Sequence, residues 1–222
     1  MKNISDAYLS AVTQVLVRGV KGVTEDGEDV ITSPEPIVET FGAVDPDSQF
    51  WIPPGLGNQA LVKYAQQLFD EGRGGFDYTY GNRIRTYFGT DQLNDCIRKL
   101  LSSPDTRRAI ITTNDPKNDC LMVNRPCMQY IQFYRNTDGK LNAFVLFRSH
   151  DILSAWFANM YAVSQLLRHV SSTTNIPIGT ITCCSVIPHI YYKRDASIMN
   201  DLRESLDYRA MVRICQLTSQ KQ

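Results

Sequence analysis

The chain has 222 residues, of which 43% are hydrophobic and 21% are charged, and its 23 basic residues balance its 23 acidic ones. This length fits one domain with a core large enough to need no disulfide or metal. A net charge of zero argues against a general binder of nucleic acids or membrane surfaces, because such proteins are basic. We therefore expect a globular protein without nucleic-acid or membrane partners.

Six cysteines are spread over the chain, and none forms a C-x-x-C pair. A zinc cage or a redox dithiol is not expected from this spacing, so we predict no metal. Most free cysteines are small buried hydrophobes, and each is by itself a weak catalytic candidate. The N-terminal segment mixes polar and apolar residues at helical spacing, unlike a signal peptide. We expect a cytoplasmic protein.

The first third of the chain predicts helices on either side of short strands. Apolar residues at helical spacing indicate a helix over 4–17. A stretch rich in Gly, Pro and acidic residues predicts turns around a strand at 29–31 and a second strand at 37–44. After a loop rich in Pro and Gly, another apolar stripe predicts a helix over 58–70, which a Gly-rich run ends.

The middle of the chain predicts a helix and then antiparallel strands. The helix covers 90–101, and a strand follows at 108–113. Two further strands, at 129–134 and 141–147, flank the Asp138-Gly139 step, which is typical of a hairpin turn.

The clearest helix covers 152–170, where apolar residues at helical spacing predict a central buried position. A last strong strand is predicted at 181–187, and the tail from Lys193 reads as helical before it becomes polar at 218–222. No repeat or long linker divides the chain, so we expect one domain over 1–222. The mixture of hairpins and helices predicts an α+β fold with helices on a mixed or largely antiparallel sheet.

Cys127 lies between Pro126 and a predicted strand. Proline cannot donate to a sheet, so this step marks the start of an element. A thiol at the mouth of a strand can face a cavity, and neighbouring arginines would lower its pKa. This pattern alone is only modest support for a nucleophile.

Three other polar motifs have a structural and a functional interpretation. Ser149 or Asp151 could cap the helix at 152–170, but Arg148 and Ser149 could instead bind a phosphate and Asp151 a heterocycle. Adjacent arginines such as Arg107-Arg108 are usually solvated. The pair His189-x-Tyr191 could bind a sugar hydroxyl, although a structural histidine is the commoner case.

The order of these motifs resembles thymidylate synthases and the related nucleotide hydroxymethylases. The resemblance covers about residues 69–192 and is densest after Pro126; the segment 147–167 looks most like the short archaeal-type members. It rests on these motifs: Tyr80-Gly81, Arg107-Arg108, Pro126-Cys127, Arg148-Ser149-x-Asp151, Asn159 and His189-x-Tyr191.

The resemblance implies a thymidylate synthase-like fold, a homodimer formed through the sheet, and a role for each motif. Cys127 would add to C6 of a uracil ring and make C5 nucleophilic. Arg148 and Ser149 would hold the phosphate, Tyr80 would belong to a proton-transfer network, and Asp151 would contact the folate pterin.

The remaining motifs would complete the nucleotide site. Arg107 and Arg108 would reach the phosphate bound by the other subunit, while His189 and Tyr191 would contact the 3′-hydroxyl of the deoxyribose. Asn159 would read the base, because an amide can donate to uracil O4 and accept from N3–H. An aspartate would suit cytosine better, so dUMP is the favoured pyrimidine nucleotide.

Several family features are missing. Thr32 stands at the spacing of an N-terminal phosphate arginine, and neither Glu35 nor Glu39 can be assigned as the glutamate that assists proton transfer. Gln66 stands where a tryptophan flanks the folate, and 217–222 lacks the apolar closing tail. A wetter site would favour addition of water over reduction.

Three functions therefore stay open. The first is a thymidylate synthase that uses 5,10-methylenetetrahydrofolate to convert dUMP to dTMP, with Cys127 as nucleophile. The second is a 5-hydroxymethylase of dUMP or another pyrimidine nucleotide on the same scaffold. The third is an inactive nucleotide-binding paralogue.

Overall fold

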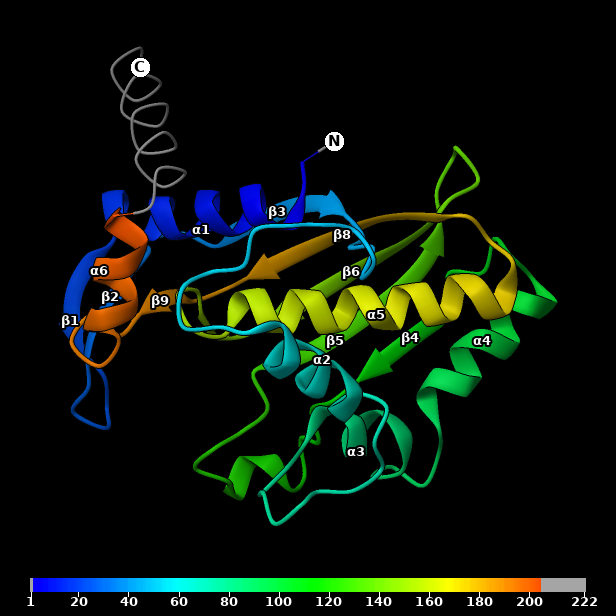
Figure 1. The fold of residues 1–222 in the computed structure, drawn as a ribbon. Coiled ribbons are helices and arrows are strands. Elements are labelled where there is room, and N and C mark those ends of the chain that lie inside the picture. Colours follow the sequence, from blue (N-terminus) through cyan, green and yellow to red (C-terminus); the bar gives the residue numbers. More distant parts are fainter. Residues whose placement is uncertain (1, 205–222) are drawn as a thin grey trace.

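A long buried helix, α5 (Trp156–Thr174), lies across one face of a five-stranded sheet in the computed structural model, which describes residues 2–204 (Figure 1). Nearly every turn of α5 buries apolar side chains, because helix α1 (Ile4–Arg18) and helix α2 (Asn58–Gln67) pack against it as well as the sheet. Burial on several sides explains its apolar composition.

The five-stranded sheet has the order β3-β8-β6-β5-β4. Its strands β6 and β8 run parallel, while the other neighbouring pairs are antiparallel, so the sheet is mixed. The strands are β3 (Ile37–Gly42), β4 (Ala109–Thr112), β5 (Met128–Arg135), β6 (Leu141–Phe147) and β8 (Ile178–Ser185).

The two faces of this sheet differ in burial. Side chains such as Ile131 and Val145 point toward the helices and are fully buried. Alternate residues point to the opposite face, as the period of two in a strand requires. There Val38 is 58% exposed and Ile110 38% exposed. This outer face carries apolar side chains that the fold of one chain does not bury.

A second sheet, of order β1-β2-β9-β7, consists of short strands and lies beside one end of the first sheet (Figure 1). Its strands are β1 (Val20–Val23), β2 (Asp29–Thr32), β7 (His150–Asp151) and β9 (Pro188–Ile190). The pairing of β7 with β9 places Asp151 opposite His189, and β2 places Thr32 opposite His189 from the other side. Residues distant in sequence therefore meet where the two sheets join.

Shorter helices complete the described chain. They are α3 (Tyr80–Arg85), α4 (Gln92–Ser102), the 3₁₀ turn η1 (Asp119–Leu121) and α6 (Ala196–Glu204). Helix α3 begins with Thr79 as its cap, whose hydroxyl accepts from the Asn82 N–H at 3.2 Å. The capped start fixes the position of Tyr80.

The structure confirms the predicted α+β class and the mixed sheet. It differs at the start of the central helix, which begins at Trp156 with Ala155 as a cap that makes no side-chain bond. The expectation that Ser149 or Asp151 caps this helix is therefore wrong. Residues His150–Asp151 pair with β9 instead, and the Asp151 carboxylate accepts from the Ser154 N–H at 3.1 Å.

The last predicted strand, 181–187, is divided between β8 and β9, because the chain bends at 186–187 into the second sheet. The tail is helical over α6, while the predicted polar end at 218–222 lies outside the described residues. Within the described part of the chain, no helix combines the length and apolar character needed to cross a bilayer.

Candidate active site

A pocket of about 640 Å³ opens where the two sheets meet. Its lining draws on loops and strands that are far apart in the sequence, as is usual for ligand sites. Eight of the ten predicted site residues line it: Tyr80, Cys127, Arg148, Ser149, Asp151, Asn159, His189 and Tyr191. The structure therefore brings most of the sequence motifs together.

Cys127 sits immediately before β5 and is half-buried in this pocket. Its carbonyl accepts from the Arg148 N–H at 2.9 Å, which fixes the end of β6 against it. Burial raises the pKa of the Cys127 thiol above its usual range, the Arg148 guanidinium opposes this, and Asp151 adds to it. The protonated thiol is therefore the favoured form of Cys127 at neutral pH.

The Arg148 side chain braces the loop before Cys127. Its Nε donates to the Pro126 carbonyl at 3.0 Å, and Nη2 donates to the Arg125 carbonyl at 2.8 Å. A fixed guanidinium keeps a positive charge near the sulfur, which is the environment that favours a thiolate.

Three tyrosines form one wall beside Cys127. Tyr64, Tyr78 and Tyr80 line the pocket, and the hydroxyl of Tyr80 accepts from the Met128 N–H at 3.1 Å. Burial is the largest cause that raises the pKa of each phenol. These hydroxyls consequently stay protonated and can act as donors.

Asn159 presents its amide to the pocket from α5. The hydroxyl of Tyr64 donates to its Oδ1, and its Nδ2 lies 3.2 Å from Nε2 of His150. Both ends of the amide are thus oriented by the protein before any ligand binds.

Ser149, His189 and Tyr191 also line the pocket and lie close to one another. Ser149 Oγ lies 3.5 Å from His189 Nδ1, which is also 3.1 Å from the Ile187 carbonyl. The rings of His189 and Tyr191 meet edge to face, with centroids 4.9 Å apart. This arrangement offers hydroxyl and imidazole groups to a polar ligand.

Asp151 is held by an ion pair with Arg194, which also bonds Asp195. The hydroxyl and amide of Ser154 donate to the same carboxylate, and the Arg194 guanidinium lies 4.0 Å from the centre of the Tyr191 ring. A ligand that used Asp151 would meet a carboxylate already fixed in place.

Arg107 and Arg108 are the two predicted residues that do not line the pocket. Both side chains are exposed on the loop before β4. Within one chain they cannot contribute to the site, so any role would need a second chain.

The structure also shows where the residues considered for the missing family features lie relative to the pocket. The tip of the β1–β2 hairpin places Glu25 and Asp26 at the pocket, and Thr32 lines it too. Glu35 lies on an exposed turn, and Glu39 is buried against Lys2, with Nζ and Oε2 2.6 Å apart. Neither of these two glutamates lines the pocket.

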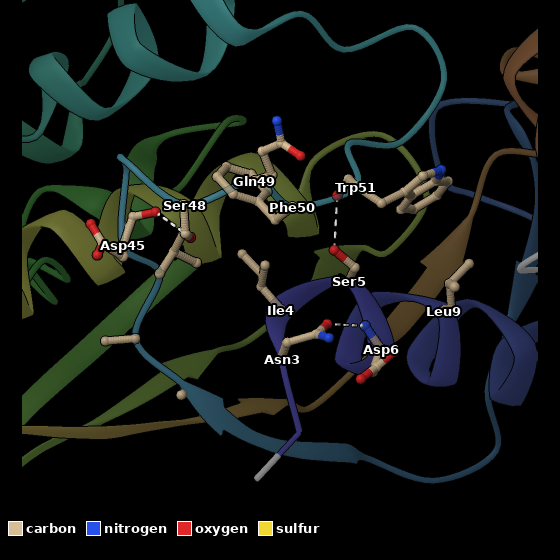
Figure 2. Close-up of a pocket in the computed structure, with 13 residues that line it drawn as sticks. Asn3, Ile4, Ser5, Asp6, Leu9, Asp45, Ser48, Gln49, Phe50 and Trp51 are labelled. Carbon is tan, nitrogen blue, oxygen red and sulfur yellow. Dashed lines mark hydrogen bonds between the residues drawn. The ribbon is translucent and has the colours of Figure 1, made fainter.

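A second hollow, of about 580 Å³, lies between the start of α1 and the loop at 45–51. Figure 2 shows the hydrogen bonds that hold the lining segments there: Ser5 donates to the Trp51 carbonyl at 2.8 Å, and Asn3 accepts from the Asp6 N–H. Its described lining residues include carboxylates but neither a thiol nor a basic group. It lacks the chemistry of the Cys127 pocket.

Sequence reasoning missed several lining residues, among them Tyr64, Tyr78, His150 and Arg194. Tyr64 falls on the apolar stripe of its helix, and such a stripe is typical of core packing. The alternation Tyr78-x-Tyr80 could have indicated two rings on one side of the same segment. His150 and Arg194 gave no local signal, because their partners are distant in sequence.

Comparisons with known proteins identify the family and the fold of the chain. A family model described as thymidylate synthase matches residues 49–221. A "Putative thymidylate synthase" from Methanothermobacter thermautotrophicus is 40% identical over 146 residues, 66% of this chain and 63% of that protein. The match thus spans less than two thirds of its length. A protein of the same name from Methanopyrus kandleri is 34% identical over 188 residues, 81% of this chain and 90% of that protein.

Among solved structures, the crystal structure of thymidylate synthase from T4 phage superposes with a TM-score of 0.68 at 17% identity, covering 89% of this chain and 80% of that one. The fold is therefore that of thymidylate synthases, which are methyltransferase-type enzymes. The chain belongs to the thymidylate synthase family, because the family model covers well over half of it.

Proposed function

We propose that this protein is a thymidylate synthase: a single-domain enzyme that transfers a one-carbon unit from 5,10-methylenetetrahydrofolate to C5 of dUMP. The observation that carries the proposal is the shared pocket of Cys127, Arg148 and Asn159. A nucleophile, a fixed cation and an oriented amide are the groups that a uracil nucleotide would require.

Cys127 is the proposed nucleophile. Its thiolate would form an Sγ–C6 bond while the C5–C6 π electrons move toward O4, and the resulting carbon nucleophile at C5 would bond to the one-carbon unit as one of the bonds of that unit to a folate nitrogen breaks. The C5 proton would then leave as the second bond between the one-carbon unit and folate nitrogen breaks. Transfer of hydride from tetrahydrofolate to the one-carbon unit, which leaves dihydrofolate, would expel Cys127 as the Sγ–C6 bond breaks and release dTMP. Arg148 stabilises the thiolate, since its guanidinium opposes the rise of the Cys127 pKa.

Other residues that line the pocket would bind the base, the phosphate and the sugar of the nucleotide. Asn159 would donate to uracil O4 and accept from N3–H. Ser149 and Arg148 would hold the phosphate by charge-assisted bonds. His189 and Tyr191, two residues apart at the end of β9, would contact the 3′-hydroxyl of the deoxyribose. Tyr80 would pass protons, because its hydroxyl remains protonated and faces the pocket.

The residues present fit the folate. Asp151 lines the pocket with a carboxylate that can accept from the amine and ring N–H of a pterin. When bound, methylenetetrahydrofolate supplies the carbon and the hydride that reduces it. Asp151 would orient the pterin, and Arg194 would hold Asp151 in place through their ion pair.

A homodimer through the outer face of the large sheet would complete the site. That face exposes apolar side chains such as Val38 and Ile110, which association would bury. Arg107 and Arg108, exposed beside β4, would then reach the phosphate in the other subunit. The protein would act in the cytoplasm as this dimer.

A 5-hydroxymethylase is the second candidate, favoured by Gln66. This side chain is exposed and does not line the pocket, so it supplies no aromatic cover against water. An inactive nucleotide-binding paralogue is the third, kept open by the acidic groups Glu25 and Asp26 at the pocket, where a phosphate would be repelled.

Product analysis with dUMP, UMP and dCMP in parallel, each with methylenetetrahydrofolate, separates these candidates. We expect dTMP and dihydrofolate from dUMP. Hydroxymethyl-dUMP with tetrahydrofolate as the sole products would overturn the first candidate in favour of the second. Absence of turnover with all three nucleotides would favour the paralogue.

A further inference from the structure

A series of hydrogen bonds between buried polar groups includes Asn159, the residue that we propose binds the base. Its Nδ2 lies 3.2 Å from Nε2 of His150, and Nδ1 of His150 lies 2.8 Å from Oγ of Ser185. On the other side, Tyr64 donates to Asn159 Oδ1. Ser185 is fully buried and His150 is 2% exposed, so water does not compete for these bonds.

The imidazole of His150 is neutral and closely packed. It stacks on Phe147 with ring centroids 3.8 Å apart and planes 10° apart. Burial, followed by the effect of His189, lowers the pKa of His150 to about 3. A neutral imidazole has one donor and one acceptor, so its tautomer decides what it can offer to Asn159.

The bonds around the ring are consistent with one tautomer. Since Tyr64 donates to Oδ1, the Nδ2 of Asn159 faces His150, and Nε2 must accept. Nδ1–H then donates to Ser185 Oγ, whose remaining neighbour is the Cys183 sulfur at 3.8 Å. The second Nδ2–H and the second lone pair of Oδ1 are left for a ligand.

Orientation of this amide has a chemical consequence. Uracil presents a donor at N3 and an acceptor at O4, whereas cytosine presents an acceptor at N3 and a donor at the exocyclic amine. An amide that flips exchanges its donor and acceptor and would serve either base. An amide fixed at both ends serves one base only.

We propose that His150, held by Ser185, is a positioning residue that fixes the amide of Asn159 and thereby makes the site select uracil over cytosine. The inference rests on the proposed function, because it assumes that a pyrimidine lies against Asn159. His150 itself need not touch the reacting atoms.

The test measures binding of dUMP and dCMP by calorimetry, together with kcat/KM for each, in wild type and variants. His150→Phe keeps an aromatic ring against Phe147 but offers no nitrogen to Asn159. We expect the preference for dUMP over dCMP to fall about 10-fold or more, the order of one buried hydrogen bond. A purely structural role would weaken both nucleotides equally and leave the ratio unchanged.

Two further variants complete the test. Ser185→Ala removes only the hydroxyl that hydrogen-bonds Nδ1 of His150 and holds the ring in place. It should lower the preference for dUMP over dCMP in the same direction by less, and it carries the test alone if His150→Phe does not fold. His169→Phe is the matched control, since His169 is exposed on α5 and does not line the pocket.

An unchanged ratio in folded His150→Phe or, if that variant does not fold, in Ser185→Ala would overturn the inference. Wild type that binds neither nucleotide would overturn the proposed function as well, and that result is recognisable before any variant is made.

Discussion

The buried ion pair between Arg83 and Asp119 holds the loop before Cys127 against helix α3. Arg83 Nη2 lies 2.6 Å from Asp119 Oδ1, and the side chains are 2% and 1% exposed. The guanidinium also lies 3.8 Å from the centre of the Tyr87 ring. Asp119→Asn should leave a buried positive charge without its counter-charge while keeping the volume of the side chain.

The expected loss follows from burial. Breaking one half of a buried pair costs about 3–5 kcal/mol, and a protein of this size loses about 2–4 °C in Tm per kcal/mol, so Tm should fall by about 6–20 °C. The double variant Arg83→Met/Asp119→Leu should recover much of this, because neither charge remains buried. Asp95→Asn is the control: its pair with Lys99 lies on the surface, with side chains 32% and 40% exposed, and should contribute less than about 1 kcal/mol.

Urea unfolding followed by circular dichroism gives the free energy of unfolding for wild type and each of the three variants. The reasoning would be refuted if Asp119→Asn lost no more stability than Asp95→Asn. It would also be refuted if the double variant lost as much stability as Asp119→Asn, since removal of the second buried charge would then recover nothing.

Three further predictions concern the pocket and its support. The pKa of His150, lowered to about 3 by burial, lies below the ordinary value of about 6.5. Between these two pKa values the imidazole is protonated in the unfolded chain but neutral in the native state. The free energy of unfolding should therefore be highest above about pH 6.5 and fall as the pH drops toward about 3. His150→Phe should flatten that part of a curve of Tm against pH. The raised pKa of Cys127 predicts that its alkylation by iodoacetamide, read by peptide mass, accelerates above about pH 9, and a plateau already reached at pH 7 would contradict this. Gly81→Ala would place a Cβ 2.0 Å from the Gln67 carbonyl oxygen, so the free energy of unfolding should fall by about 1–3 kcal/mol. An unchanged midpoint of urea unfolding would contradict this close contact.

Apolar periodicity predicted those elements whose burial is one-sided and regular. Helix α1 and the hairpin of β5 and β6 lie close to their predicted ranges. Strand β1 was missed because all four of its residues are exposed and show no alternation. Helix α3 was missed because its six residues are mostly polar, and its start depends on the Thr79 cap.

The site was predictable to the extent that its residues carry local motifs. Cys127 and Arg148 could be named because each sits in a short pattern at the end of a strand. His150 gave no such signal, since its partners Asn159 and Ser185 are 9 and 35 residues away and meet only when β7 pairs with β9. Long-range pairing of this kind is set by the whole fold and not by neighbouring residues.

The central claim is that Cys127 attacks C6 of a uracil nucleotide and so labilises the proton at C5. Release of tritium from [5-³H]dUMP in the presence of methylenetetrahydrofolate measures this step directly. We expect release by wild type and by Cys120→Ser, whose thiol is exposed and outside the pocket, and none by Cys127→Ser. Equal release by wild type and Cys127→Ser, or none by wild type, would contradict the claim.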